Sequence, residues 1–271
     1  MDIVSSPLNL SLEAYPGETL LFNWPKGVSQ LHIDHKPFSK IKDRYAFGVV
    51  SHKVGLSSYL LGEYPIQSGH AFQEPRQKIF IHQFAVKLQI GKKPSTLRLP
   101  ADVLKKLSAH DDESRENDTK MMKEILTQEN GEILTECWQR PLRSKIVSRF
   151  ASPRFLPDGR QYYHSGLDLR AWTGTPIPAA SAGVVAFADH MVVPGNMVIV
   201  DHGGGVFSRY MHLSDIQVTK GDKISKGQTL GLSGATGRVE APHLHWEIVW
   251  KGVSADPLRF LAVADKICNQ G

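Results

Sequence analysis

Residues 243–250 read His-Leu-His-Trp-Glu-Ile-Val-Trp, a run of apolar and aromatic residues that opens with two histidines. Such a run predicts a β-strand. Because side chains alternate along a strand, both imidazoles would point to one face and Leu244 to the other. Their Cα atoms would lie roughly 6.7 Å apart, so one imidazole could bind a metal ion while the other works beside it. An exposed polar strand face would give the same pattern, so this stretch alone leaves both interpretations open.

Two other stretches place a histidine where it could take part in chemistry. Residues 164–168 read His-Ser-Gly-Leu-Asp. On a straight strand His164 and Asp168 would lie roughly 13 Å apart, but Gly166 permits a bend that could bring them together. Residues 210–214 read Tyr-Met-His-Leu-Ser, at the end of a strand expected to begin near Val206. Taken alone, the histidine of that stretch would be a buried residue bonded to its neighbours.

The three stretches together could form a catalytic zinc site. Two histidines and one carboxylate are a common protein ligand set for zinc, and they leave the fourth position open for water. Zinc lowers the pKa of that water towards 7 and polarises a carbonyl group, so no serine or cysteine nucleophile is needed. Such a site also needs a proton acceptor and a group that holds the developing oxyanion. Two further histidines could supply both.

The strings H-S-G-L-D, Y-M-H-L-S and P-H-L-H-W-E resemble the lysostaphin/LytM-type zinc endopeptidases of bacterial cell walls. The resemblance covers about residues 138–261, because the framework between the motifs also agrees. Its glycine-containing segments and closing dipeptide are 174–179, 198–203, 218–228, 231–237 and Asp256-Pro257. The resemblance implies the family fold, the duplicated hybrid motif, a small antiparallel β domain with a groove across the zinc.

The resemblance also implies roles for five residues. His164, Asp168 and His245 match the ligands of one zinc ion per chain. His212 and His243 match a pair of catalytic histidines that do not bind the metal. One of the pair would act as general base towards water and the other would stabilise the tetrahedral intermediate; the sequence leaves open which does which. Two other histidines of this half, His190 and His202, match no catalytic position and are expected in loops.

The predicted function is a zinc metalloendopeptidase that hydrolyses the peptide cross-links of bacterial peptidoglycan, with D-alanyl-diaminopimelate bonds as the favoured target. An alternative is an autoinhibited or regulatory zinc-binding module that activates another cell-wall hydrolase. The large N-terminal half, which catalysis alone would not need, supports this alternative. Some relatives have lost zinc ligands and act only as activators. Because none of the five positions is substituted here, the sequence favours activity.

The chain of 271 residues can hold two domains. Residues 1–99 carry short apolar or alternating runs separated by turn signals, which predicts a small β-sandwich-like domain. Residues 100–137 begin polar and then place apolar residues at helical spacing near 121–126, which predicts a helical connector. Residues 138–271 would form the antiparallel β peptidase domain, and no long helix is expected in it up to Leu261. The chain is therefore predicted to be mostly β.

The net charge of +5 and a pI near 9.1 favour an anionic partner, although a contribution to solubility explains them equally well. No dense basic cluster with interleaved aromatic residues appears, so peptidoglycan is preferred over nucleic acid.

No stretch approaches the roughly 20 apolar residues that span a bilayer, and the first residues lack the features of a secretory signal. The expected location, periplasm or cell envelope, therefore follows from the substrate, with any signal absent from this sequence. A partner cell-wall enzyme or regulator is also considered.

The two cysteines, Cys137 and Cys268, lie at the two ends of the C-terminal half. Their separation excludes a C-x-x-C zinc or redox motif. In an oxidising compartment they could form a disulfide that joins the start of this domain to its end. Two free thiols are an equally acceptable interpretation.

Overall fold

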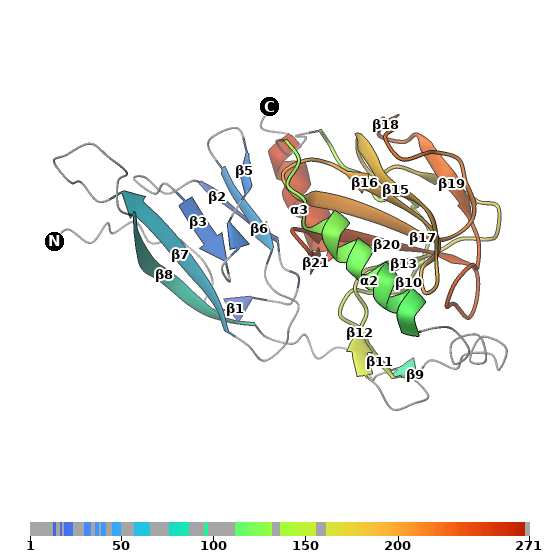
Figure 1. The fold of residues 1–271 in the computed structure, drawn as a ribbon, viewed down its shortest axis with the longest axis horizontal. Helices are drawn as coiled ribbons and strands as arrows, with labels where there is room; N and C mark the ends of the chain where they lie inside the picture. Colours follow the sequence, from blue (N-terminus) through green and yellow to red (C-terminus); the bar gives the residue numbers. More distant parts are fainter. Residues whose placement is uncertain are drawn as a thin grey trace.

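The computed structural model describes 112–131, 136–155 and 161–268 continuously and, in the N-terminal part, residue 17 and the segments 13–14, 19–23, 30–33, 36–37, 39–41, 45–49, 57–65, 76–86 and 95–96. The described residues are mostly in β-strands, with two helices, and this confirms the predicted fold class. In Figure 1 strands β1 to β8 of the N-terminal part lie to one side of the orange and red C-terminal sheet, whereas β9 lies beside β11.

The N-terminal part contains two sheets. The first has the order β1-β8-β7-β3-β4, and the second has the order β2-β6-β5. Their strands are β1 (Glu13–Ala14), β2 (Thr19–Asn23), β3 (Gln30–Ile33), β4 (Lys36–Pro37), β5 (Ser39–Ile41), β6 (Tyr45–Val49), β7 (Ser57–Pro65) and β8 (Arg76–Val86). All pairings are antiparallel except the parallel pair β1–β8. The β-structure predicted for this region is therefore confirmed.

The C-terminal half is organised around a sheet with the order β10-β13-β20-β17-β16-β15-β18, to which β14, β19 and β21 are added. The pairings are antiparallel throughout. The strands are β10 (Ile146–Ser148), β13 (Leu167–Arg170), β14 (Pro176–Pro178), β15 (Gly183–Met191), β16 (Gly195–Asp201), β17 (Val206–Ile216), β18 (Lys223–Ile224), β19 (Thr229–Ser233), β20 (His243–Trp250) and β21 (Val253–Ala255).

A small three-stranded sheet adjoins this half. It consists of the hairpin β11 (Pro153–Phe155) and β12 (Gln161–Tyr163), with β9 (Ser95–Thr96) added in parallel to β11. The hairpin ends one residue before His164, so a strand from the N-terminal part pairs with the segment that leads into the histidine motif.

Strand β20 separates two layers of apolar side chains. Its even-numbered residues, Leu244 to Trp250, belong to the main core, where they are fully buried. On the other face Val249 belongs to a second cluster with Phe207, Met211 and the last turn of helix α2 (Asp112–Leu126). This helix lies across the sheet in Figure 1. Because the two histidines and Glu247 have odd numbers, they share the face of Val249.

Helix α3 (Pro257–Cys268) packs Phe260, Ala264 and Ile267 into the main core. No long helix was expected up to Leu261, and the start of α3 at Pro257 was not predicted. The signal was the Asp256-Pro257 dipeptide. The Asp256 carboxylate accepts the backbone N–H of Leu258 at 2.9 Å, and proline is favoured at the first helical position because it needs no N–H partner there.

Besides the β9–β11 pairing, the two parts of the chain meet at the end of β20 that is far from its histidines. Ser39 accepts a hydrogen bond from the indole of Trp250 at 2.9 Å and donates one to the carbonyl of Gly204 at 2.6 Å. The Lys251 ammonium donates to the carbonyl of Pro37 at 2.8 Å. Because eight residues of strand span roughly 23 Å, these contacts lie well away from His243.

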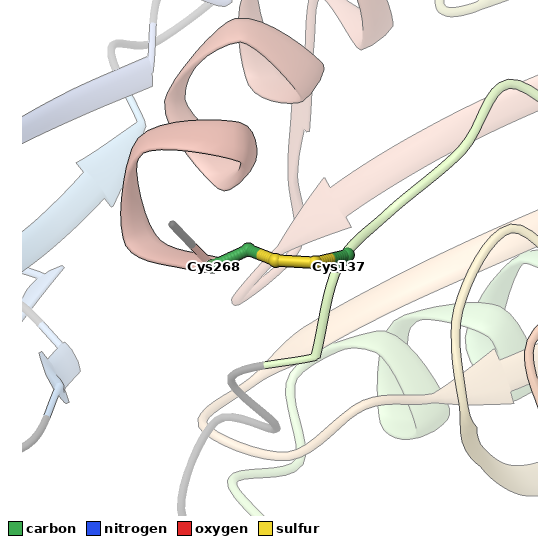
Figure 2. The surroundings of a disulfide bond; sticks show 2 residues. All are labelled: Cys137 and Cys268. Carbon is green, nitrogen blue, oxygen red and sulfur yellow. A yellow bond between two sulfur atoms is a disulfide. The ribbon is translucent and has the colours of Figure 1, made fainter. Parts of the chain in front are cut away.

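Cys137 and Cys268 form a disulfide with a Cα–Cα distance of 5.0 Å (Figure 2). The bridge ties the segment before Trp138 to the end of α3, so the pairing that the sequence left open is present. The indole of Trp138 packs edge-on against Phe260 of the same helix, with ring centroids 4.7 Å apart.

Replacing both cysteines by serine should lower the free energy of unfolding by about 3–5 kcal/mol, because the bridge closes a loop across a sequence separation of 131 residues. Urea unfolding of the wild-type protein and the double variant, followed by circular dichroism, measures the difference. Wild type treated with reductant is the control and should match the variant. Equal unfolding midpoints for oxidised wild type and variant would contradict the prediction.

Candidate metal centre and active site

Three strands bring the predicted residues together. Antiparallel pairing of β13 with β20 sets Asp168 directly opposite His245 and Arg170 opposite His243. On the other side of β20, Met211 of β17 is the partner of His245, and His212 follows it. His164 lies in the short segment between β12 and β13. All five predicted residues therefore lie on three neighbouring strands or on the segment that leads into one of them.

The chain bends between His164 and Asp168, as expected, but the role of Gly166 is more specific than freedom to bend. Its φ is not in the left-handed region. A Cβ atom at this position would lie 2.6 Å from the carbonyl oxygen of Trp246 and 2.9 Å from Nε2 of His245. Glycine is needed here because β20 passes so close to the bend.

Three side-chain atoms that could each bind a metal ion converge in a buried cluster. Nε2 of His164 lies 2.9 Å from Oδ1 of Asp168, Nδ1 of His245 lies 2.8 Å from the same oxygen, and the two nitrogens are 3.0 Å apart. The three residues are between 5% and 8% exposed. The cluster has the composition and spacing of a group that could hold a metal ion.

Hydrogen bonds at the outer edges of the imidazoles decide where their protons are. Nδ1 of His164 faces the carbonyl of Arg149 at 2.8 Å, and a carbonyl can only accept, so Nδ1 carries the proton. Nε2 of His245 faces the Glu247 carboxylate at 2.9 Å and is protonated for the same reason. In their neutral forms both rings thus direct lone pairs at the Asp168 oxygen. Nε2 of His164, Nδ1 of His245 and Oδ1 of Asp168 then all present lone pairs to one another. Such an arrangement is stable only with a cation between them, so the three residues fit a metal ion.

The second oxygen of Asp168 is held separately. Oδ2 accepts a hydrogen bond from Nη2 of Arg154 at 3.1 Å, and the same guanidinium nitrogen donates to Oγ of Ser148 at 2.7 Å. This contact leaves Oδ1 to face the two histidines. Arg154 could not be identified from the sequence, because its contact with Asp168 joins residues of two different sheets.

The two remaining histidines stand beside the cluster with matching orientations. Nδ1 of His243 donates to the carbonyl of Ala241 at 2.8 Å, and Nδ1 of His212 donates to the carbonyl of Thr236 at 2.9 Å. In its neutral form each ring therefore has its lone pair on Nε2. Nε2 of His243 lies 3.5 Å from Oδ1 of Asp168. The ring centroids of His212 and His243 are 5.1 Å apart, so both can reach one substrate group.

The backbone of His212 is strained. Its φ of 63° lies in the left-handed region, which residues other than glycine and asparagine rarely adopt. The register of β17 against β16 shifts nearby, between Asn196 and Val198, as expected of a bulge. Such strain is commonly kept at functional positions. Here it turns His212 out of the alternation of β17.

Residues 162–257 match the family model described as peptidase family M23. This part of the chain is an M23 peptidase domain. All five residues predicted for the site lie within the match. The resemblance found in the sequence is therefore confirmed at the level of the family.

The M23 domain is similar to two curated proteins of Vibrio cholerae. The peptidoglycan DD-endopeptidase ShyA is 42% identical over 127 residues, which are 45% of this chain and 30% of that protein. The peptidoglycan DD-endopeptidase ShyC is 37% identical over 132 residues, which are 48% of this chain and 30% of that protein. The matched region thus covers about 30% of the relatives' own lengths.

A solved structure from Pseudomonas aeruginosa, described as an M23 peptidase, has a TM-score of 0.66 and covers 91% of this chain and 94% of its own. The two sequences are 22% identical, so this likeness concerns the fold. It extends beyond the M23 domain into the N-terminal part of the chain.

Burial and neighbouring charges determine the pKa values of Asp168 and His245 in the proposed metal site. Burial raises the pKa of the Asp168 carboxyl, but the three imidazoles that face it, those of His164, His243 and His245, outweigh burial and hold that pKa well below its usual range. Burial lowers the pKa of His245, yet its bonds to Asp168 and Glu247 outweigh burial and raise that pKa to about 9. In the metal-free protein a proton therefore occupies the contact between His245 and Asp168, and a metal ion binds in competition with it.

Burial, together with the neighbouring His243 and His245, lowers the pKa of His212 to about 3. Burial also lowers the pKa of His164, against the opposing effect of Asp168. Both imidazoles are therefore neutral at physiological pH. A neutral His212 can accept a proton at Nε2.

The expectation of a loop is wrong for His190 and correct for His202, which lies in the connection between β16 and β17. His190 is an exposed residue of β15 whose ring bonds to Asn196 at 2.9 Å. His202 is completely buried, with Nδ1 bonded to the carbonyl of Ala182 at 2.6 Å and Nε2 lying 2.7 Å from Oγ of Ser208. It supports the core of the M23 domain and takes no part in the site.

His202 should make the M23 domain less stable in mild acid. Burial lowers its pKa from 6.5 to about 4, so between these values the unfolded chain binds a proton that the folded chain does not. The stabilising contribution of neutral His202 to the free energy of unfolding is fully present above pH 6.5. It decreases by roughly 3 kcal/mol in total as the pH falls towards 4.

The comparison is between wild type and His202→Gln, unfolded in urea at pH 7 and at pH 4.5. Groups other than His202 titrate in both proteins, so the difference between their losses isolates this residue. The variant should lose less stability than wild type over this range. Equal losses in the two proteins would contradict the prediction.

Proposed function

We propose that this protein is a zinc-dependent endopeptidase that hydrolyses the peptide cross-links of bacterial peptidoglycan. The observation that carries the proposal is the convergence of His164, Asp168 and His245, beside two further histidines, inside an M23 domain. The two curated relatives quoted above are named peptidoglycan DD-endopeptidases, which supports peptidoglycan as the substrate.

The residues divide into two groups with different tasks. His164, Asp168 and His245 would hold one zinc ion through two nitrogens and one carboxylate oxygen. When bound, zinc lowers the pKa of water and polarises a carbonyl group. His212 and His243 would face the substrate with their unprotonated Nε2 atoms.

The proton moves through these histidines. One of them accepts a proton from the attacking water, and this imidazolium later protonates the leaving amine. The other would take a proton from solvent on its Nε2 before the attack, and it would then donate a hydrogen bond to the carbonyl oxygen as the carbon becomes tetrahedral. The backbone carbonyls of Thr236 and Ala241 fix both rings, so neither must reorient during the reaction.

The proposed bond is the D-alanyl-diaminopimelate cross-link, since the names of the relatives specify a DD bond. The alternative function, a regulatory module that activates another cell-wall hydrolase, is not favoured, because all five site residues are intact. A partner cell-wall enzyme is not needed for the proposed reaction.

The proposed domain limits are 1–99 for the N-terminal β domain, 100–137 for the helical connector and 138–271 for the peptidase domain.

An extracytoplasmic location, in the periplasm or cell envelope, is part of the proposal. The substrate lies there, and the Cys137–Cys268 disulfide fits an oxidising compartment. Neither helix of the described residues has the length and apolar character needed to cross a membrane.

The test uses purified diaminopimelate-type peptidoglycan, treated with zinc-loaded protein, with protein stripped of metal by a chelator, and with stripped protein after zinc is restored. Chromatography of the muropeptides should show loss of cross-linked dimers in the first and third samples only. Full activity of the stripped protein would refute the zinc mechanism. Intact dimers in all three samples, with zinc bound, would refute the substrate.

A further inference from the structure

Glu247 is a buried carboxylate whose oxygens are both engaged. It is 2% exposed and lies on β20, two residues after His245 and on the same face. Oε1 accepts hydrogen bonds from Nε2 of His245, at 2.9 Å, and from the hydroxyl of Ser165. Oε2 accepts one from Nη1 of Arg209 at 2.6 Å. A carboxylate so held cannot turn away from the imidazole.

The sheet register builds this arrangement. Arg209 of β17 is the cross-strand partner of Glu247, and Met211 is the partner of His245. The Arg209 side chain is 14% exposed, so the ion pair is shielded from water. A buried carboxylate without a partner is strongly unfavourable, and pairing with the Arg209 guanidinium offsets part of that cost. On the remaining side Gly166 leaves room for Cγ of Glu247, which a Cβ there would approach to 2.6 Å.

We propose that Glu247, fixed by Arg209 and Ser165, is a positioning residue that selects Nδ1 of His245 as the metal-binding atom and strengthens the zinc site. A neutral imidazole has one proton, and the carboxylate keeps it on Nε2. The lone pair of Nδ1 then points at Oδ1 of Asp168 and Nε2 of His164. The negative charge also makes the imidazole a better donor to a cation.

The three cluster residues are thus oriented by three different partners. A backbone carbonyl holds His164, a guanidinium holds Asp168, and a carboxylate holds His245. Only the last partner adds negative charge to the cluster, so Glu247 should influence cation affinity most. This inference rests on the proposed zinc site and does not depend on the substrate.

The experiment measures the zinc dissociation constant by competition with a chromophoric chelator for wild type, Glu247→Gln and the double variant Glu247→Gln/Arg209→Met. The double variant removes both charges, so no buried ion is left unpaired if the single variant folds poorly. Both variants should bind zinc about 10–100-fold more weakly than wild type. Asp256→Asn removes a carboxylate remote from the cluster, at the start of α3, and should leave the constant unchanged.

Cobalt(II) absorption provides a readout that a merely structural role would not alter. Replacing zinc by cobalt in each protein should give visible absorption bands. These bands should shift in both Glu247 variants and stay unchanged in Asp256→Asn, because Glu247 contacts the proposed ligand His245 and Asp256 contacts none of the three proposed ligands. Melting temperatures of the metal-free proteins report on folding.

Zinc affinity and cobalt bands equal to those of wild type in both Glu247 variants would overturn the inference. A wild-type protein that binds no zinc would overturn the proposed function, and this inference with it. Weaker zinc binding in the variants, combined with intact peptidoglycan in the digestion test, would uphold the inference and refute the proposed substrate alone.

Discussion

Replacing His245 by alanine should reduce peptidoglycan hydrolysis by more than about 10³-fold, since a single oxyanion donor is already worth about 10²–10³ in kcat and this change affects the whole proposed centre. His245 contributes one of the three converging donor atoms and also connects Asp168 to Glu247. Its removal leaves two donors and a cavity where the imidazole was. The loss should therefore appear in zinc content as well as in rate.

The measurement combines muropeptide chromatography with the zinc-to-protein ratio for His245→Ala and for the control His190→Ala. His190 is an exposed histidine of β15 outside the site, so its variant should keep both properties. Glu247 loses a partner in His245→Ala, and circular dichroism checks that the variant is folded. Wild-type rates in a folded His245→Ala protein would contradict the assignment of the centre.

Replacing either non-ligand histidine should separate catalysis from metal binding. His243→Ala and His212→Asn should each lower kcat by about 10²–10⁴-fold, the usual contribution of a positioned acid or base. Zinc content should stay near one per chain, because neither ring is among the three converging groups. Asparagine is chosen for His212 because it tolerates the left-handed backbone at φ 63°.

Steady-state kinetics on a soluble cross-linked muropeptide dimer, with zinc measured in parallel, test this prediction. A pH profile for each variant identifies the general base, since loss of the base should remove one limb of the profile. Loss of zinc from His243→Ala would show instead that His243 is a ligand, which its 3.5 Å approach to Asp168 makes worth testing. An unchanged kcat in both variants would contradict the proposed proton transfer.

The strand alternation in residues 243–250 was enough to predict which side chains of β20 share a face, because that property is local. The approach of His164 to Asp168 was predictable from the bend and the family resemblance. Three features of the site were not predicted: the positive φ of His212, the contact of Arg154 with Asp168, and the role of Glu247. Each of these features depends on how separate strands pair with one another. Strand pairing cannot be predicted from a few consecutive residues.

Glu247 shows how such a residue could be recognised. It lies two residues after His245, on the face that carries chemistry, at a position where an unpartnered charge would be costly. The sequence analysis quoted it only as part of a motif. Helix α3 was missed for a different reason, because Asp256-Pro257 was taken as the end of the family framework rather than as a helix start. The contact of Ser39 with Trp250 joins residues 211 apart and was beyond local reasoning.

Strand β20 directs its odd-numbered residues, including the proposed site residues His243 and His245, to one face and its even-numbered residues to the main core. Deleting a single residue after His243 would shift every following side chain to the opposite face. Trp246 and Trp250 would then turn towards the site, while Glu247 would enter the core without Arg209. The core-facing positions of this segment should therefore tolerate exchange for another apolar residue of similar size, whereas an insertion or deletion should disrupt the core and the proposed site together.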